Sequence, residues 1–174
     1  MKSTAKFTCL RCGDCCRNLV RQTKEGVHSG LALFPDETWL FPSNIIFPYR
    51  GLGENPEEGD FKVVMFQLEK KVCPCLEMGM KEARCKIYEE RPLVCRCYPF
   101  QPIHVQDDQV FSATDLKCPS IQRLRREGRL TNIEDPAAEI ACLELWRRIS
   151  PVAKQKWVFD LKSKKWRISP ISRL

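Results

Sequence analysis

The chemistry open to this chain depends on cysteine, of which it has eleven in 174 residues. The cysteines gather in "CLRCGDCC" (residues 9–16) and in "CKIYEERPLVCRCYPF" (residues 85–100), and the others are Cys73, Cys75, Cys118 and Cys142. Disulfides, a zinc site and an iron–sulfur cluster each use thiols at this density. Because the chain has only two histidines, a large metal site must be ligated mainly by thiolates. That favours zinc or iron–sulfur over copper, nickel or non-haem iron.

The first segment has the spacing C-x2-C-x2-C-C, which lets successive thiolates curl around one centre, with Gly13 relieving the turn. Three cysteines at this spacing and a remote Cys-Pro hold the cubane cluster of bacterial-type ferredoxins, and Cys118-Pro119 is such a remote pair. A zinc ribbon normally has two C-x2-C pairs, whereas this spacing occurs only in residues 9–16. The pattern therefore favours a [4Fe–4S] cluster, with structural thiols or a redox loop as the alternative.

Arginines accompany the cysteines. Those within six residues of a thiol include Arg11, Arg17, Arg84, Arg91 and Arg96. Guanidinium groups would lower thiol pKa values, offset the negative charge of a four-thiolate cluster and raise its reduction potential. The alternative is that they form surface ion pairs with Glu82, Glu89 and Glu90.

These segments resemble the CxxCxxCC (YkgJ-like) family of zinc- or iron-chelating domains over about residues 9–120. The match includes "CPCL" at residues 73–76 and the flanking Tyr88, Arg91, Pro92, Arg96, Tyr98 and Pro99. The resemblance implies metal ligands at Cys9, Cys12, Cys15, Cys16, Cys73, Cys85, Cys95 and Cys118. Eight thiols suffice for two four-thiolate sites or for one site with spares. The loop between Cys85 and Cys95 is expected to be set by Tyr88, Arg91 and Pro92, and Tyr88 either donates to a ligand or faces the core.

Three cysteines fall outside the family pattern. Cys75 and Cys97 stand where the family usually has another residue, and they are extra ligands, a redox pair or core thiols. Cys142 lies on the apolar face of an expected helix and is predicted to be a buried small hydrophobe.

Chain length, apolar runs and the N-terminal sequence indicate what kind of protein this is. A chain of 174 residues can form one domain with an apolar core of its own. No apolar run approaches the length of a membrane span. The N-terminus is basic but lacks the apolar segment of a secretory signal, so we expect a cytoplasmic protein with reduced thiols.

Positive charge is concentrated at the C-terminal end. Residues 146–174 hold nine lysines and arginines against one acid, Asp160, in a chain of net charge +7. This segment is predicted to be a solvated hairpin face, with binding to an acidic protein or nucleic acid as the alternative.

The local patterns predict an α+β fold with a small, irregular, metal-stabilised cysteine core, short helices and hairpins. Helices are expected after Pro35, over 119–128 and over 135–149, where Asp135 is the expected N-cap. A strand is expected over 61–72, and hairpins over 103–113 and near residues 156–169. Residues 49–60 are expected to be a mobile surface loop. We predict a cysteine core over residues 1–120 and a basic extension over 121–174 that packs on it as one domain.

Three functions fit these motifs. The favoured one is a metal-binding protein with one or two iron–sulfur clusters in a redox or sensing role. The alternative is a structural zinc protein that acts as an adaptor through its basic C-terminal part. The cysteine segment also resembles that of flagellin lysine N-methylases, which implies S-adenosylmethionine-dependent methyl transfer as a third possibility. An ordinary nucleotide-binding methyltransferase is disfavoured, because no strand is followed by G-x-G-x-x-G.

Overall fold

The computed structural model describes residues 5–23, 26–107, 109–129, 133–152 and 157–169. The chain forms two compact units, each built from two stretches of sequence. The first unit contains residues 1–15 and 75–147, and the second contains residues 16–74 and 148–174. Within the described ranges, no helix has the length and apolar character needed to cross a membrane.

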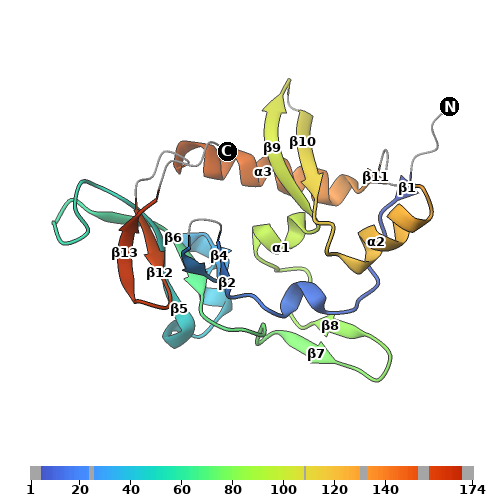
Figure 1. Cartoon of the computed structure of the whole chain (residues 1–174), viewed down its shortest axis with the longest axis horizontal. Coiled ribbons are helices and arrows are strands. Elements are labelled where there is room, and N and C mark those ends of the chain that lie inside the picture. The colour runs from blue at the N-terminus through green and yellow to red at the C-terminus, as the bar shows by residue number, and fades with distance from the viewer. Residues whose placement is uncertain (1–4, 24–25, 108, 130–132, 153–156, 170–174) are drawn as a thin grey trace. The chain divides into compact units, whose positions relative to one another are not determined.

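The first unit combines short hairpins with helices (Figure 1). Strand β1 (Ala5–Lys6) pairs in parallel with β11 (Ile133–Glu134). Two antiparallel hairpins follow, β7 (Leu76–Met78) with β8 (Ala83–Cys85) and β9 (Phe100–Gln106) with β10 (Gln109–Thr114). The helices are α1 (Leu93–Cys97), α2 (Pro119–Arg126) and α3 (Pro136–Ile149), whose last two residues belong to the second unit.

Local sequence explains where the helices of this unit begin. Pro119 and Pro136 each occupy the first helical turn, where a missing N–H leaves no hydrogen bond unmade. The Asp135 carboxylate accepts a bond of 3.2 Å from the Ala138 N–H and so caps α3. Apolar faces of the three helices supply the core of the unit, with buried Leu93, Cys97, Ile121, Leu124, Ala138, Ala141, Cys142 and Leu145.

The second unit is built on a five-stranded antiparallel sheet of order β13-β12-β5-β6-β4 (Figure 1). Its strands are β4 (Leu31–Leu33), β5 (Ile46–Leu52), β6 (Lys62–Leu68), β12 (Trp157–Asp160) and β13 (Lys165–Ile168). A small hairpin of β2 (Arg21–Gln22) and β3 (His28–Ser29) precedes the sheet. The 3-10 helices are η2 (Pro35–Leu40), η3 (Ser43–Ile45) and η4 (Ser150–Val152), while η1 (Asp14–Cys16) spans the junction between the units.

Gln67 is a fully buried polar side chain that ties several strands of this sheet together. Its amide nitrogen donates to the carbonyls of Pro48 at 2.7 Å and Phe159 at 2.9 Å. Its amide oxygen accepts the Gly30 N–H at 2.9 Å. A buried amide is tolerated because its hydrogen bonds are made, and loss of these bonds would orphan three backbone groups at once.

The α+β class is confirmed, as are the helices after Pro35, over 119–126 and over 136–149, the strand that begins at Lys62 and the two hairpins. The expected loop over residues 49–60 is wrong in its first part, because Tyr49–Leu52 continue β5. Gly51 suits this strand, since a Cβ there would lie 2.1 Å from the Phe61 ring. The predicted boundary at residue 120 remains a prediction about the family core, and each compact unit contains residues from both sides of it.

Candidate metal centre

Residues 9–15 form a tight loop in the first unit whose backbone turns back on itself. Arg11 and Gly13 adopt positive φ angles of 51° and 74°. Glycine suits position 13 for two reasons. Its positive φ angle disfavours other residues, and a Cβ there would lie 2.8 Å from the Ala83 Cβ. The Arg11 N–H donates to Cys9 Sγ over 3.3 Å, and the Asp14 N–H donates to Cys12 Sγ. Backbone N–H groups therefore donate to two of the three thiols of the loop. Such hydrogen bonds stabilise the thiolate form.

Cys118 is brought to this loop by the start of α2. The Leu10 N–H donates to Ser120 Oγ over 2.9 Å, although the two residues are 110 positions apart. Ser120 lies two residues beyond Cys118, which immediately precedes the helix. Cys118 is held in turn by its own N–H, which donates to the Asp115 carbonyl at 3.0 Å. The remote Cys-Pro of the sequence motif is thus anchored beside the Cys9–Cys15 loop, with the Cys118 thiol buried.

Tyr98 connects the two parts of this group. Burial raises the pKa of its phenol most, and negative charge at Cys118, Asp115 and Cys15 raises it further. The Tyr98 hydroxyl also donates a hydrogen bond to Cys118 Sγ. Cys15 and Cys118 therefore both lie within electrostatic reach of the half-buried Tyr98 hydroxyl. From the sequence, Tyr98 is only a flanking residue of the motif, with no predicted role, and no role is predicted for Ser120, which follows Cys118-Pro119 in a first helical turn.

The thiols of the loop influence one another. Burial raises the pKa of Cys12 most, the Asp14 N–H opposes this, and negative charge at Asp14, Cys15 and Cys9 raises the pKa further. Three thiolates in one short loop repel each other, and a bound cation would relieve that repulsion and displace the thiol protons.

Two arginines near the loop share one carboxylate. Arg11 Nη1 lies 3.2 Å and Arg84 Nη2 lies 3.3 Å from Glu82 Oε1. The surface-pair alternative is therefore confirmed for these two residues. Because two guanidinium groups meet a single carboxylate, one positive charge remains unbalanced in this trio, next to the Cys9–Cys12 turn.

The segment before α1 holds Tyr88 and Arg91 in a cation–π contact. The Arg91 guanidinium carbon lies 3.7 Å from the centre of the Tyr88 ring, and Arg91 Nε donates to the Tyr88 carbonyl at 2.7 Å. Tyr88 is 53% exposed, so of the two alternatives for this residue the core-facing one is wrong. The contact braces the Cys85–Cys95 loop, with Pro92 buried before α1.

The remaining predicted ligands are distributed over both units. Cys85 ends β8, and the neighbouring Lys86 N–H donates to the Cys75 carbonyl at 2.9 Å, which places Cys75 beside it. Cys95 lies within α1. Cys16 and Cys73 meet in the second unit, where the Cys73 N–H donates to the Cys16 carbonyl at 2.8 Å. Cys16, Cys73, Cys85 and Cys95 stay predicted ligands on the family pattern.

Cys97 and Cys142 form a separate, buried pair between α1 and α3, with 1% and 0% of their surfaces exposed. The Cys97 thiol donates to Cys142 Sγ, which raises the pKa of Cys97 together with burial and lowers the pKa of Cys142. Burial of Cys142 on the helix face is confirmed. Cys97 is likewise buried in the core, which agrees with the core-thiol alternative for this residue.

The donors around the loop suit a thiolate-bound metal. The eleven cysteines, all within the described ranges, form no disulfide. Among the residues whose placement is described, no three His, Cys, Asp or Glu side chains already stand at single-ion ligand positions. Cys9, Cys12, Cys15 and Cys118 nevertheless offer sulfur donors, and N–H or O–H groups donate to three of them, Cys9, Cys12 and Cys118. Such sulfur groups suit zinc or an iron–sulfur cluster.

Comparison with known proteins gives one match. The CxxCxxCC family model, described as "Putative zinc- or iron-chelating domain", covers residues 8–119. No curated protein and no solved structure matches the chain. The matched residues include every cysteine of the loop, the Cys85–Cys97 segment and Cys118. This chain belongs to the CxxCxxCC family of zinc- or iron-chelating domains.

Proposed function

We propose that this protein binds a [4Fe–4S] cluster through Cys9, Cys12, Cys15 and Cys118 and uses it in a redox or sensing role. The observation that carries the proposal is the hydrogen bond from Leu10 N–H to Ser120 Oγ. It joins the C-x2-C-x2-C loop to the helix that starts directly after Cys118. The spacing is that of a bacterial-type cubane ligand set, and these contacts support one shared site.

The surroundings of the four sulfurs support a redox or sensing role. Cys9 and Cys15 are exposed and Cys12 is partly exposed, whereas Cys118 is buried. A cluster at this position would face solvent on one side, so that an electron partner or oxygen could reach it. When bound, such a cluster supplies one-electron redox chemistry.

The residues around the sulfurs would tune a bound cluster. The N–H groups of Arg11 and Asp14 and the hydroxyl of Tyr98 donate to Cys9, Cys12 and Cys118, respectively. Hydrogen bonds to the sulfurs stabilise the more negative, reduced state and raise the reduction potential. The unbalanced positive charge of the Arg11–Glu82–Arg84 trio acts in the same direction.

Cysteine variants test the ligand assignment. Wild-type protein, Cys118→Ala, Cys9→Ala and the matched control Cys142→Ala are reconstituted anaerobically with iron and sulfide, and visible absorption is recorded with bound iron and sulfide. We expect the wild type and Cys142→Ala to carry the cluster, and Cys118→Ala and Cys9→Ala to lose most of it. Cys9 is exposed, so Cys9→Ala remains informative if the buried Cys118→Ala fails to fold. Full cluster content in folded Cys9→Ala and Cys118→Ala would contradict the assignment.

A further inference from the structure

A pocket lies in the second unit, outside the cysteine segments, between the β2–β3 hairpin and the β12–β13 turn. Its volume is about 440 Å³, and it is lined by Gln22, Gly26, His28, Asp160, Lys162, Ser163 and Arg167. The two hairpins are joined by a backbone hydrogen bond of 2.9 Å from Leu161 N–H to the His28 carbonyl. A pocket of this size is in the range that holds a small molecule.

Asp160 stands at the back of the pocket with both carboxylate oxygens occupied by donors. Oδ1 accepts the N–H groups of His28 at 3.0 Å and Lys162 at 3.2 Å. Oδ2 accepts the Ser163 hydroxyl at 2.8 Å and lies 3.0 Å from Arg167 Nη2. A carboxylate offers about four acceptor positions, and with 1% of its surface exposed this one has none left for a ligand. The buried acid therefore orients the pocket and does not attract a cation into it.

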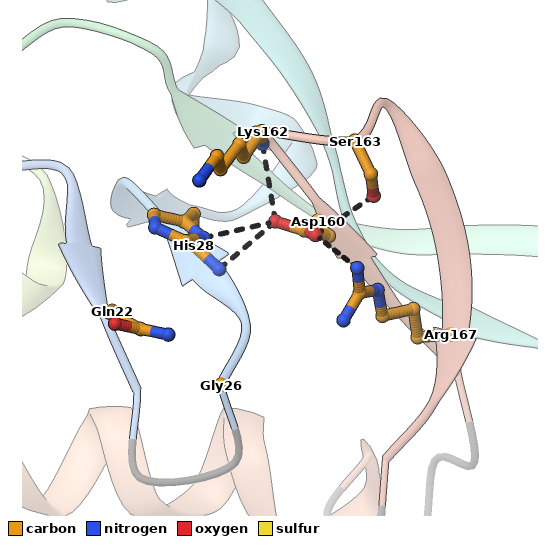
Figure 2. Close-up of a pocket in the computed structure, with 7 residues that line it drawn as sticks. All are labelled: Gln22, Gly26, His28, Asp160, Lys162, Ser163 and Arg167. Carbon is orange, nitrogen blue, oxygen red and sulfur yellow. Dashed lines mark hydrogen bonds and ion pairs between the residues drawn. The ribbon is translucent and has the colours of Figure 1, made fainter.

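The polar groups that remain are donors that face the opening. Figure 2 shows the Gln22 amide and the Arg167 guanidinium facing each other across the gap, with the Lys162 side chain extending toward His28. One end of the Arg167 guanidinium is committed to Asp160, and the other points toward the opening. No partner is present among the described residues for the Lys162 ammonium. The positive charges of Lys162 and Arg167 exceed the negative charge of Asp160, so the three side chains together carry a net charge of about +1 near neutral pH.

His28 adds an unusual feature to the wall. Its Nδ1 is buried and has no hydrogen-bond partner among the described residues, although it lies 3.6 Å from Asp160 Oδ1. Figure 2 shows the other edge of the imidazole turned away from Asp160. The His28 N–H donates to Asp160 Oδ1 over 3.0 Å, which holds the backbone at His28 in the wall of the pocket.

Ser163, His28 and Asp160 are the three residue types of a serine hydrolase triad, but they are not arranged as in that triad. The Ser163 hydroxyl donates to Asp160 Oδ2 and not to the imidazole, so no base withdraws its proton. The arrangement is that of a binding pocket, not that of an activated nucleophile.

We propose that this pocket binds a small molecule through an oxyanion head, a phosphate or a carboxylate. Lys162 supplies a point charge, Arg167 a planar fork and Gln22 a neutral N–H donor, which are groups that recognise such oxygens. The saturated Asp160 holds Arg167 and the His28 backbone in place while it leaves the mouth of the pocket positive. Both cations come from the basic segment for which binding to an acidic protein or nucleic acid was the alternative to a solvated hairpin face.

The proposal is tested by titration of the ¹⁵N-labelled full-length protein with inorganic phosphate and, separately, with acetate, at ionic strength matched with chloride. We expect saturable shifts of the Gln22, Gly26 and His28 signals with at least one of the two probes. The probe that binds more tightly, phosphate or acetate, identifies the head group of the ligand. Lys162→Met should weaken binding about tenfold, as for loss of a charged hydrogen bond, and Gln22→Met about threefold, as for a neutral one.

The matched control is Lys62→Met, which removes the same charge from an exposed position of β6 in the same unit. It should leave the affinity unchanged within about twofold. Shifts that do not saturate with either probe, or an equal loss of affinity in Lys162→Met and Lys62→Met, would overturn the proposal. Both lysines are exposed, so neither change should prevent folding.

Discussion

Replacement of Asp160 is predicted to destabilise the second unit strongly and in a pH-dependent way. The side chain is 2% exposed and accepts hydrogen bonds from the N–H groups of His28 and Lys162 and from the Ser163 hydroxyl. Arg167 adds an ion pair at 3.0 Å. Asp160→Asn keeps the shape of the side chain and removes its charge, whereas Asp160→Ala removes every acceptor.

The magnitude follows from these contacts. The Arg167 side chain is 49% exposed, so its ion pair contributes no more than about 1 kcal/mol after screening. The two backbone N–H groups lose a charged acceptor in Asp160→Ala and are left unsatisfied, at a cost of about 1 to 3 kcal/mol each. We therefore expect Asp160→Ala to lower the free energy of unfolding by about 4 kcal/mol, and Asp160→Asn by about 2 kcal/mol because Asn retains one acceptor.

The pH dependence gives the sharper test. Burial alone would raise the pKa of Asp160, but hydrogen bonds from Ser163, His28 and Lys162 and the charge of Arg167 lower it overall. A carboxyl whose pKa is lowered by folding stabilises the folded state above its unfolded pKa, about 3.9, and that stabilisation is lost as the pH falls through the folded value. The difference between wild type and Asp160→Asn, from urea unfolding, should be largest near pH 7 and should shrink below about pH 4. A difference that stays constant from pH 7 to pH 3 would refute the role given to the charge.

Gln67→Leu should lower the free energy of unfolding by about 3 kcal/mol, because it orphans the Gly30 N–H and the carbonyls of Pro48 and Phe159; chemical denaturation measures this, and a loss below about 1 kcal/mol would contradict it. Cys142→Ser should leave the metal content unchanged and cost about 1.5 kcal/mol, because it buries a hydroxyl at a position with 0% exposure. A fall in bound metal per chain would instead make that residue a ligand. Tyr98→Phe should keep the cluster but lower its reduction potential by about 40 mV, the equivalent of roughly 1 kcal/mol for one electron. Protein-film voltammetry gives this value, and an unchanged potential would argue against the hydroxyl as a donor to the bound sulfur.

Local patterns allowed helices η2, α2 and α3, strand β6 and the β9–β10 and β12–β13 hairpins to be predicted. Asp135-Pro136 marks the start of α3 because a carboxylate cap and a first-turn proline act on the nearest residues, and the structure has that cap. The extension of β5 through Tyr49–Leu52 could not be found in the same way, because a segment rich in glycine looks like a loop. Strand β5 continues through these residues because it pairs with β6 and β12. Such pairing depends on strands distant in the sequence and cannot be inferred from the local residue types.

The cysteines of the candidate site could be named from the sequence, but the residues that support them could not. Spacing alone indicates that Cys9, Cys12 and Cys15 share a centre, because the constraint is local. The contribution of Ser120 depends on a hydrogen bond across 110 residues, for which the sequence contains no signal beyond the neighbouring Cys118-Pro119. Spacing alone could not decide whether Arg11 and Arg84 face the thiols or pair with Glu82, since both compete for the same charge. The pocket around Asp160 is likewise formed by hairpins from opposite ends of the sequence.

Iron and acid-labile sulfide analysis of full-length protein, produced with ample iron and purified without oxygen, tests the central claim most directly. We predict iron and sulfide in nearly equal amounts, about four of each per cluster, with little zinc. Stoichiometric zinc without sulfide in the same preparation would contradict the iron–sulfur proposal and assign the cysteines to a structural zinc site.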